Sequence, residues 1–246
     1  MRYLMTFSYD GSKYSGYQKQ PDCVTVQGEI EKALKKINSN RVVSIHASGR
    51  TDAGVHAINQ KAHFDLKKEI DVYKLKDSIN GLVPKSIYVK DVQVVADDFH
   101  ARFNVKAKEY VYKINMGEYN PIERDYVYQY NKRLDVVDME RAMKYLEGTH
   151  DFKSFAKADE KYDSTVRTIV QTNMIRNLKN VNEITMSFFG TGFLRYMVRN
   201  IVGFLIEIGE GKRKPEDIIT VLGAKNRTEA GKTANPEGLY LKDVFY

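Results

Sequence analysis

The sequence predicts an α+β protein built of two similar halves, each a ferredoxin-like or RRM-like α/β unit. Short segments alternate apolar and polar residues, and segments with apolar residues three and four apart lie between them. The same order returns in the second half with longer insertions. We expect the halves, residues 1–104 and 105–246, to form one extended, mostly antiparallel sheet with flanking helices. The functional residues would face a central cleft between the halves.

The first half follows the order β-α-β-β-α-β. Residues 2–9 alternate and stop at an Asp10-Gly11 turn, which is typical of a strand. Thr25 is a suitable N-cap for a helix whose apolar residues share one face. The remaining expected elements are strands over 41–46 and 58–66, a helix over 72–80 that stops before Pro84, and a strand over 86–95.

The second half repeats this order with longer connections. Residues 110–114 alternate as a strand, and Asp138 is a candidate N-cap for a helix that reaches Leu146. Beyond this helix we expect strands over 166–176 and 183–189, an apolar helix over 194–208, a short helix after Pro215 and a closing strand over 239–246.

Charge and composition favour an RNA-binding protein of the cytoplasm. The 246 residues carry a formal net charge of +7 with 17 Tyr and 11 Phe, and a basic surface rich in rings suits RNA. The alternative is a mildly basic protein that binds no nucleic acid. The single cysteine, Cys23, excludes an intrachain disulfide and indicates a reducing compartment. No apolar run approaches the ~18 to 20 residues of a membrane helix.

One loop carries the strongest candidate for chemistry. It reads His46-Ala-Ser-Gly-Arg-Thr-Asp-Ala-Gly-Val-His56. Gly49 and Gly54 permit backbone conformations closed to other residues and let a ligand approach the main chain. The carboxylate of Asp52 beside the guanidinium of Arg50 suits nucleophilic or acid–base chemistry. The alternative is a surface turn with an Arg–Asp pair.

A metal site is not expected. The five histidines show neither clustering with cysteine nor a His-Glu-x-x-His spacing. The glycine-rich phosphate and dinucleotide motifs are absent as well. His46 and His56 flank the loop, and a structural hydrogen-bonding role is the simpler interpretation of both than a catalytic one.

Two segments near the middle of the chain interleave basic and aromatic residues. Residues 98–103 place Arg102 beside two rings, for substrate binding or for packing at the junction of the halves. The lysines and tyrosines at alternate positions from 106 to 112 share one face of a strand. A ring such as that of Tyr110 then stacks on a base while the lysines meet phosphates. The alternative for each tyrosine is a place in the core.

Arg195 and Arg199 lie one turn apart on the expected apolar helix. Arginines in apolar surroundings require carboxylate or phosphate partners. An arginine at the start of this helix is therefore a candidate partner for Asp52. The run Lys-Arg-Lys at 212–214 is more simply a solvated charged surface.

Five motifs in the right order resemble the bacterial tRNA pseudouridine synthase A family, and the resemblance covers nearly the whole chain. Residues 49–56, Gly-Arg-Thr-Asp-Ala-Gly-Val-His, are similar to the signature loop of that family. The other motifs are Tyr-Asp-Gly-Ser-Lys-Tyr-Ser-Gly-Tyr-Gln at 9–18, Asp-Asp-Phe-His-Ala-Arg-Phe at 97–103, Phe-Leu-Arg-Tyr-Met-Val-Arg-Asn-Ile-Val-Gly at 193–203 and Gly-Leu-Tyr-Leu at 238–241.

The resemblance implies an isomerase that converts uridine in RNA to pseudouridine without a metal or organic cofactor. The N1–C1′ bond breaks, the uracil rotates, and C5 bonds to C1′. Asp52 matches the essential aspartate of the family, which attacks the base or the sugar or assists elimination. Arg195 matches the arginine that pairs with this aspartate, and Tyr110 the tyrosine that stacks on the flipped uridine and assists proton removal from C5. A base must leave its stack for such chemistry.

The resemblance also indicates the RNA and the assembly. Arg50 matches an arginine that contacts RNA and helps to hold the extruded nucleotide. With Arg102, Arg199 and Tyr110 it completes the expected substrate-binding residues. The usual target of the family is uridine at positions 38–40 of the tRNA anticodon stem-loop, and the family is homodimeric. We therefore expect tRNA and a second copy of the chain as partners, and no membrane.

The chain departs from the family pattern at three places. These are Val-Thr-Val-Gln at 24–27 in place of Arg-Thr-Val-Gln, Asn59 in place of glycine, and Thr-Ala-Asn-Pro at 233–236 in place of Thr-Ala-Pro. All three bear on RNA recognition, so a paralogue with another RNA target and a non-catalytic RNA-binding module are alternatives. A carboxylate phosphotransferase would need an acidic metal-binding cluster such as Asp-x-Asp, which the sequence lacks beside Asp52.

Overall fold

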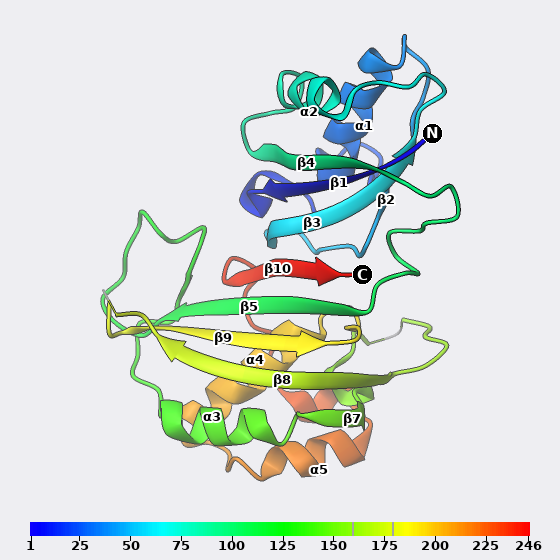
Figure 1. Cartoon of the computed structure of the whole chain (residues 1–246). Coiled ribbons are helices and arrows are strands. Elements are labelled where there is room, and N and C mark those ends of the chain that lie inside the picture. Colours follow the sequence, from blue (N-terminus) through cyan, green and yellow to red (C-terminus); the bar gives the residue numbers. More distant parts are fainter. Residues whose placement is uncertain (159, 179) are drawn as a thin grey trace. The chain divides into compact units, whose positions relative to one another are not determined.

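The chain folds into two compact units (Figure 1). A computed structural model describes residues 1–158, 160–178 and 180–246. The first unit comprises Met1–Lys106 together with Tyr240–Tyr246, and the second comprises Ala107–Leu239. The predicted division at 104/105 follows chain order, whereas in the structure the last seven residues return to the first unit.

The return of the C-terminus has a structural cause. The last strand, β10 (Leu239–Phe245), pairs in parallel with the start of β3 (His56–Asp65), with Tyr240 opposite His56. The hydroxyl of Tyr246 donates a hydrogen bond to the carbonyl oxygen of Ala101 at 2.7 Å. These contacts attach the chain end to the first unit.

The sheet of the first unit has β1 (Arg2–Tyr9) between β3 and β4 (Ile87–Val95), both antiparallel to it. The two-residue strand β2 (His46–Ala47) pairs with the second half of β3, also antiparallel. The order β1-α1-β2-β3-α2-β4 confirms the β-α-β-β-α-β prediction for this unit. The core face of β1 carries Tyr3, Met5 and Phe7, all fully buried.

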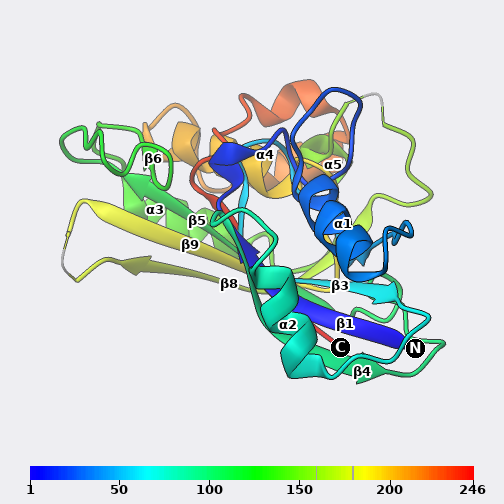
Figure 2. The same ribbon diagram turned by 90° about the horizontal axis from the view of Figure 1, so that it is seen from above.

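Two helices pack beside this sheet (Figures 1 and 2). Helix α1 (Val26–Ile37) begins as predicted, because the hydroxyl of Thr25 accepts a hydrogen bond from the amide of Gly28. Helix α2 (Val72–Asn80) follows the carboxylate of Asp71, which accepts a bond from the amide of Lys74. Each helix buries an apolar stripe, as its sequence periodicity predicts.

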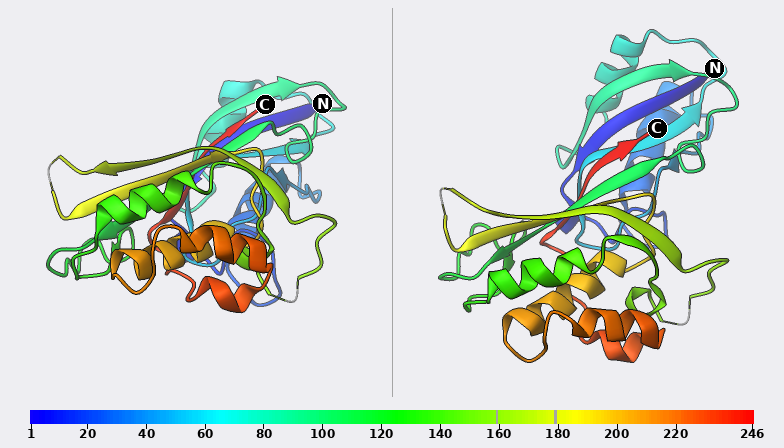
Figure 3. Two further views of the ribbon diagram at one scale, coloured as in Figure 1. Left: turned by 90° about the horizontal axis from the view of Figure 1, so that it is seen from below. Right: turned by 60° about the horizontal axis from the view of Figure 1, so that its bottom comes forward.

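In the second unit, four antiparallel strands lie side by side in the sheet, and three helices cover them (Figure 3). The strands, in spatial order, are β5 (Ala107–Asn115), β9 (Glu183–Gly190), β8 (Val166–Arg176) and β7 (Gly148–Asp151), with the short β6 (Tyr128–Gln129) parallel to β5. The helices are α3 (Val136–Lys144), α4 (Met197–Gly209) and α5 (Asp217–Ala224). Short 3₁₀ turns lie at Lys153–Phe155 and Arg227–Ala230 in this unit and at Gly11–Lys13 in the first unit. The α+β class with mostly antiparallel pairing is confirmed.

The strand predicted over 41–46 is wrong except at its end, where His46 begins β2. The backbone of Ile45 is bonded by helix side chains in place of a neighbouring strand. Its amide donates to Oε1 of Glu31 at 3.3 Å, and its carbonyl accepts from Nε2 of Gln27 at 3.5 Å. Side chains of α1 thus supply partners that a strand would have supplied.

Two predicted helix starts are also corrected. Helix α3 begins after Asp135, whose carboxylate accepts from the amides of Val137 and Asp138, so Asp138 lies inside the first turn. Helix α4 begins at Met197 rather than at 194, because Tyr196 has left-handed backbone angles (φ 65°) and interrupts the helix. In the described ranges, no helix has both the length and the apolar character needed to cross a membrane.

Candidate active site

The start of the Asp52 loop is tied to strand β3. The amide of Ser48 donates to the carbonyl of Lys61 at 2.8 Å. The hydroxyl of Ser48 donates to Oε1 of Gln60 at 2.7 Å, and Nε2 of Gln60 donates to the carbonyl of Gly49 at 3.0 Å. Ser48 and Gln60 are fully buried. Because buried polar groups lose much free energy when unpaired, these bonds fix the loop where it leaves the sheet.

The middle of the loop rests on two tyrosines. The amide of Tyr17 donates to the carbonyl of Thr51 at 3.1 Å. The Thr51 hydroxyl lies 2.8 Å from the hydroxyl of Tyr9, which is buried at the end of β1. Burial raises the pKa of Tyr9 to about 12, so its hydroxyl stays protonated at neutral pH. The residue next to Asp52 is therefore held through both its backbone and its side chain.

The end of the loop is a tight turn around Asp52. The amide of Val55 donates to the carbonyl of Asp52 at 3.2 Å, and Gly54 has φ +79°, which agrees with the glycine predicted to allow this turn. At the exit, the amide of Gly11 donates to Nδ1 of His56 at 3.0 Å. His56 is almost fully buried. Its burial and this bond agree with the structural hydrogen-bonding role expected for it, rather than with a catalytic one.

The two charged residues of this loop differ in exposure. Asp52 is partly buried, whereas Arg50 is exposed. A partly buried carboxylate on a fixed turn can meet a substrate in a set direction. An exposed guanidinium on the same loop is placed for phosphates.

The other predicted catalytic residues lie in the second unit. Tyr110, on β5, is largely buried, and its ring contacts Phe193 edge to face with the centroids 5.0 Å apart. Tyr112 is fully buried, and its hydroxyl donates to the carbonyl of Asn235 at 2.7 Å. For Tyr112 the core alternative is therefore the correct one, and Tyr110 is buried as well, so its stacking role stays a prediction.

Arg195 and Arg199 flank the ring of Tyr196, with guanidinium carbons 5.4 and 5.1 Å from its centroid. Arg195 precedes α4 and is about half exposed, and its Nη1 lies 3.6 Å from Oε2 of Glu160. Arg199 is in the first turn of α4, where its Nε donates to the carbonyl of Ala234 at 2.8 Å. The left-handed Tyr196 thus brings the two predicted arginines onto one ring.

Arg102 belongs to the first unit but lies on a different segment from Asp52. It is exposed, with its guanidinium carbon 5.9 Å from the ring centroid of Phe103. The pairing of Asp52 with Arg195 would join residues of different units. The stacking of Tyr110 would bring a residue of the second unit to the uridine that Asp52 attacks. Both stay predictions.

The sequence interpretation missed the residues that fix the loop. Gln60 had a readable signal, because positions 60, 62 and 64 share one face of a strand and the other two are Ala62 and Phe64. A glutamine on that apolar face needs buried partners. Tyr9 and Tyr17 stood within a recognised motif, but nothing local in the sequence shows that they contact Thr51.

Comparison with known proteins identifies the class to which this α+β chain with its Arg-Thr-Asp turn belongs. The family model described as tRNA pseudouridine synthase matches residues 5–104 and 142–246, and the chain belongs to this family of isomerases. It is 45% identical over 247 residues to tRNA pseudouridine synthase A of Oceanobacillus iheyensis, covering 100% of this chain and 96% of the relative. Proteins of the same name from Geobacillus sp. strain WCH70 and Latilactobacillus sakei are 44% and 42% identical over 246 residues, covering 100% of this chain and 98% of each relative.

Proposed function

We propose that this enzyme converts uridine to pseudouridine at positions 38–40 of the tRNA anticodon stem-loop, with Asp52 as its nucleophile. Family membership supports the reaction and the RNA class. The observation that carries the role of Asp52 is the construction of its turn, which is bonded to β3 by Gln60 and to β1 by Tyr9 through Thr51. So many fixed bonds around one partly buried carboxylate indicate a preorganised reactive group.

The reaction is an isomerisation whose atoms balance without a co-reactant. Asp52 attacks the base or the sugar, or assists elimination, and the N1–C1′ bond breaks. The detached uracil turns so that C5 bonds to C1′, and any bond that Asp52 has formed to the base or the sugar breaks, which returns the free carboxylate. The proton on C5 then leaves, and N1 gains a proton. Any hydrogen label on C5 is therefore released to solvent once per turnover.

The remaining predicted residues take supporting roles in this proposal. Arg195 keeps Asp52 charged and oriented, since a nearby guanidinium favours the ionised carboxylate. Tyr110 stacks on the flipped uridine and assists removal of the C5 proton. Arg50, Arg102 and Arg199 bind the RNA backbone, for which guanidinium groups have suitable geometry.

The decisive experiment uses tRNA labelled with tritium at C5 of uridine. The wild-type enzyme should release tritium to water, whereas Asp52→Ala and Asp52→Asn should release none above background. Asp91→Asn, which removes an exposed carboxylate from β4 of the same unit, is the matched control and should keep wild-type release. Mapping pseudouridine in the product RNA identifies the positions. Release by the Asp52 variants at the control rate would refute the role of Asp52.

We also propose that the enzyme acts as a homodimer in the cytoplasm. A dimer lets one tRNA contact both copies of the chain. A free, exposed Cys23 suits a reducing compartment. Light scattering after size-exclusion chromatography tests the dimer, since a mass of about twice 28.4 kDa is expected and the mass of a single chain would contradict it.

A further inference from the structure

Four aromatic rings of the first unit form a continuous series that ends at the surface. The rings of His46 and His63 stack with centroids 5.0 Å apart. His63 contacts His100 edge to face at 4.6 Å, and His100 contacts Phe103 at 4.2 Å. His46 also contacts His100 at 5.8 Å. We name these four residues the ring series.

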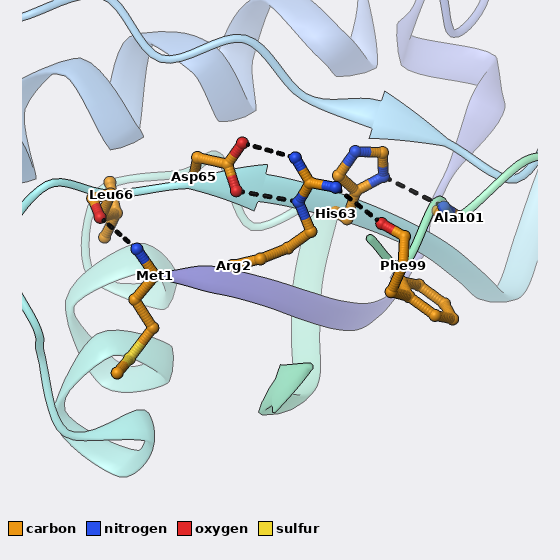
Figure 4. Close-up of polar contacts among 7 residues, drawn as sticks. All are labelled: Met1, Arg2, His63, Asp65, Leu66, Phe99 and Ala101. Atoms are coloured by element: carbon orange, nitrogen blue, oxygen red, sulfur yellow. Dashed lines mark hydrogen bonds and ion pairs between the residues drawn. The ribbon is translucent and has the colours of Figure 1, made fainter. Parts of the chain in front are cut away.

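The segment that carries the outer rings is anchored to the sheet (Figure 4). The Arg2 guanidinium donates two bonds to the carboxylate of Asp65, at 2.9 and 2.8 Å, and a third to the carbonyl of Phe99 at 2.9 Å. Nδ1 of the buried His63 accepts from the amide of Ala101 at 3.1 Å. Strands β1 and β3 therefore hold residues 99–101 from two sides.

The turn that follows is closed by its own hydrogen bonds. The amide of His100 donates to Oδ1 of Asn104, and the amides of Phe103 and Asn104 donate to the carbonyl of His100. Nδ1 of His100 accepts from the amide of Arg102 at 3.1 Å. The Phe103 ring is thus presented on a fixed turn, yet it is 75% exposed. A partner could therefore contact this ring without any rearrangement of the backbone that carries it.

The charges around the ring series are mainly cationic at its outer end. Arg102 lies over the Phe103 ring, and Arg2 and Arg102 both lower the pKa of His100, where burial is the largest cause. Burial likewise lowers the pKa of His63 to about 4. Both rings are therefore uncharged at neutral pH. The acidic Asp65 is paired with Arg2, as described above.

We propose that the solvent-accessible rings of the series, His46, His100 and Phe103, form a stacking platform for an unpaired base of the RNA substrate, and that the Arg102 guanidinium, which lies over the Phe103 ring, turns aside to hold a phosphate when the base stacks. This proposal rests on the proposed function and adds to it a base-binding site separate from the Asp52 turn. Stacking on exposed rings with a neighbouring guanidinium is how proteins bind unpaired nucleotides without reading their sequence.

Strand β3 connects this platform to the Asp52 loop. Gln60 holds the loop at Gly49, and His63, three residues further along β3, holds the platform at Ala101. Three residues of strand span about 10 Å. Gln60 and His63 are an odd number of positions apart and point to opposite faces of β3, so the platform is a second contact for the substrate RNA, apart from the Asp52 loop, and it contributes to substrate binding rather than to the bond changes.

The absence of tryptophan from the sequence allows a direct test of stacking. Phe103→Trp introduces a single fluorescent reporter at the platform. Titration with an unmodified tRNA anticodon stem-loop should quench its emission, because a stacked base quenches indole. Tyr73→Trp, at a side chain of equal exposure (73%) on α2, is the matched control and should show no quenching. The proposal would be overturned if RNA quenched the two variants equally. It would also be overturned if the emission changed with protein concentration in the absence of RNA.

Kinetics provide an independent test. Phe103→Ala should raise KM for tRNA by about 5- to 150-fold, the factor that corresponds to ~1–3 kcal/mol for one stacked base. The effect on kcat should be smaller, and Phe103→Tyr should restore most of the affinity because its ring also stacks. Tyr73→Ala should behave as wild type. An unchanged KM in a Phe103→Ala enzyme that melts at the wild-type temperature would overturn the platform. If the wild-type enzyme released no tritium, the proposed function itself would be refuted instead.

Discussion

Gly11 lies directly against the carbonyl of Val55, so that a Cβ atom on Gly11 would stand 2.0 Å from the Val55 oxygen. This contact joins the first residue of the 3₁₀ turn after β1 to the turn that carries Asp52. The amide of the same glycine donates to His56, so two successive residues of the loop exit depend on Gly11. No side chain fits between these backbones, and the position of the Asp52 turn is thereby linked to β1.

Gly11→Ala should accordingly weaken both folding and catalysis. The added methyl group must push the Val55 carbonyl away, at a cost of about 1–3 kcal/mol typical of overpacking. Urea denaturation should show this loss, and tritium release should fall because the turn shifts. Gly223→Ala is the control, since a Cβ there meets nothing within 4 Å and alanine favours the helix. Wild-type stability in Gly11→Ala would contradict the close contact.

The sequence was sufficient for those parts of the fold that depend on local patterns. Thr25 and the stripe behind it predicted α1, and the alternation of residues 2–9 predicted β1, because caps and periodicity act within one element. The prediction of a strand over 41–46 was wrong because the hydrogen-bond partners of the Ile45 backbone are side chains of α1. The predicted start of α4 was wrong because Tyr196 has a left-handed backbone conformation. Tyrosine has no local preference for this conformation, so the surroundings must set it and the sequence does not indicate it.

The candidate site divides in the same way. Asp52 and Arg50 were predicted as site residues because glycines mark their loop in the sequence. Tyr17 was not, because its bond to Thr51 joins segments 34 residues apart in the chain. Chemistry-bearing residues are thus visible in a sequence, while the residues that hold them become visible only when the chain is folded.

Gln60→Leu should loosen the start of the loop. The substitution leaves the Ser48 hydroxyl and the Gly49 carbonyl without their partner, which costs about 1–3 kcal/mol for buried groups. We expect a lower kcat, because the loop positions Asp52, together with a smaller rise in KM, because Arg50 directly follows Gly49. Combining it with Ser48→Ala should recover part of the stability, since it removes the hydroxyl that has lost its Gln60 acceptor. Strictly additive losses in the double variant would show that the two side chains are not coupled.

Stability should decrease on acidification through His63. Its pKa is lowered to about 4 in the folded protein, against an ordinary value near 6.5. Between these values the unfolded chain binds a proton that the folded protein does not. The free energy of unfolding therefore falls as pH decreases through this window, by up to about 1.4 kcal/mol per pH unit from this one group.

The check for His63 is urea denaturation from pH 7 to pH 4. His63→Gln keeps an acceptor for the Ala101 amide but cannot titrate, so its stability should depend less steeply on pH than that of the wild type. His150→Gln, in the second unit, keeps His63 and should keep the wild-type slope. Parallel curves for wild type and His63→Gln would show that His63 binds its proton equally well in both states.

Asn200→Ala should release the arginine-bearing start of α4. Asn200 is fully buried, and its Nδ2 donates to the carbonyl of Phe155 at 2.7 Å. Its Oδ1 accepts from Nη2 of Arg227 at 3.0 Å and from the hydroxyl of Thr233 at 2.6 Å. Alanine removes one partner from each of these three groups, while Arg227 Nη2 keeps its bond to the Thr233 hydroxyl at 2.8 Å, and the loss should cost about 3 kcal/mol.

Because Asn200 directly follows Arg199, this loss should also affect Arg199, which we propose to bind RNA. We expect a lower melting temperature together with a raised KM for tRNA. Asn173→Ala, at an exposed position on β8, is the matched control and should change neither quantity. Asn200→Asp separates the two roles of the amide, since it keeps an acceptor for Arg227 but loses the donor to Phe155. It should therefore be less stable than the wild type but more stable than Asn200→Ala, and the reverse order would place the main contribution of Asn200 outside its bond to Arg227.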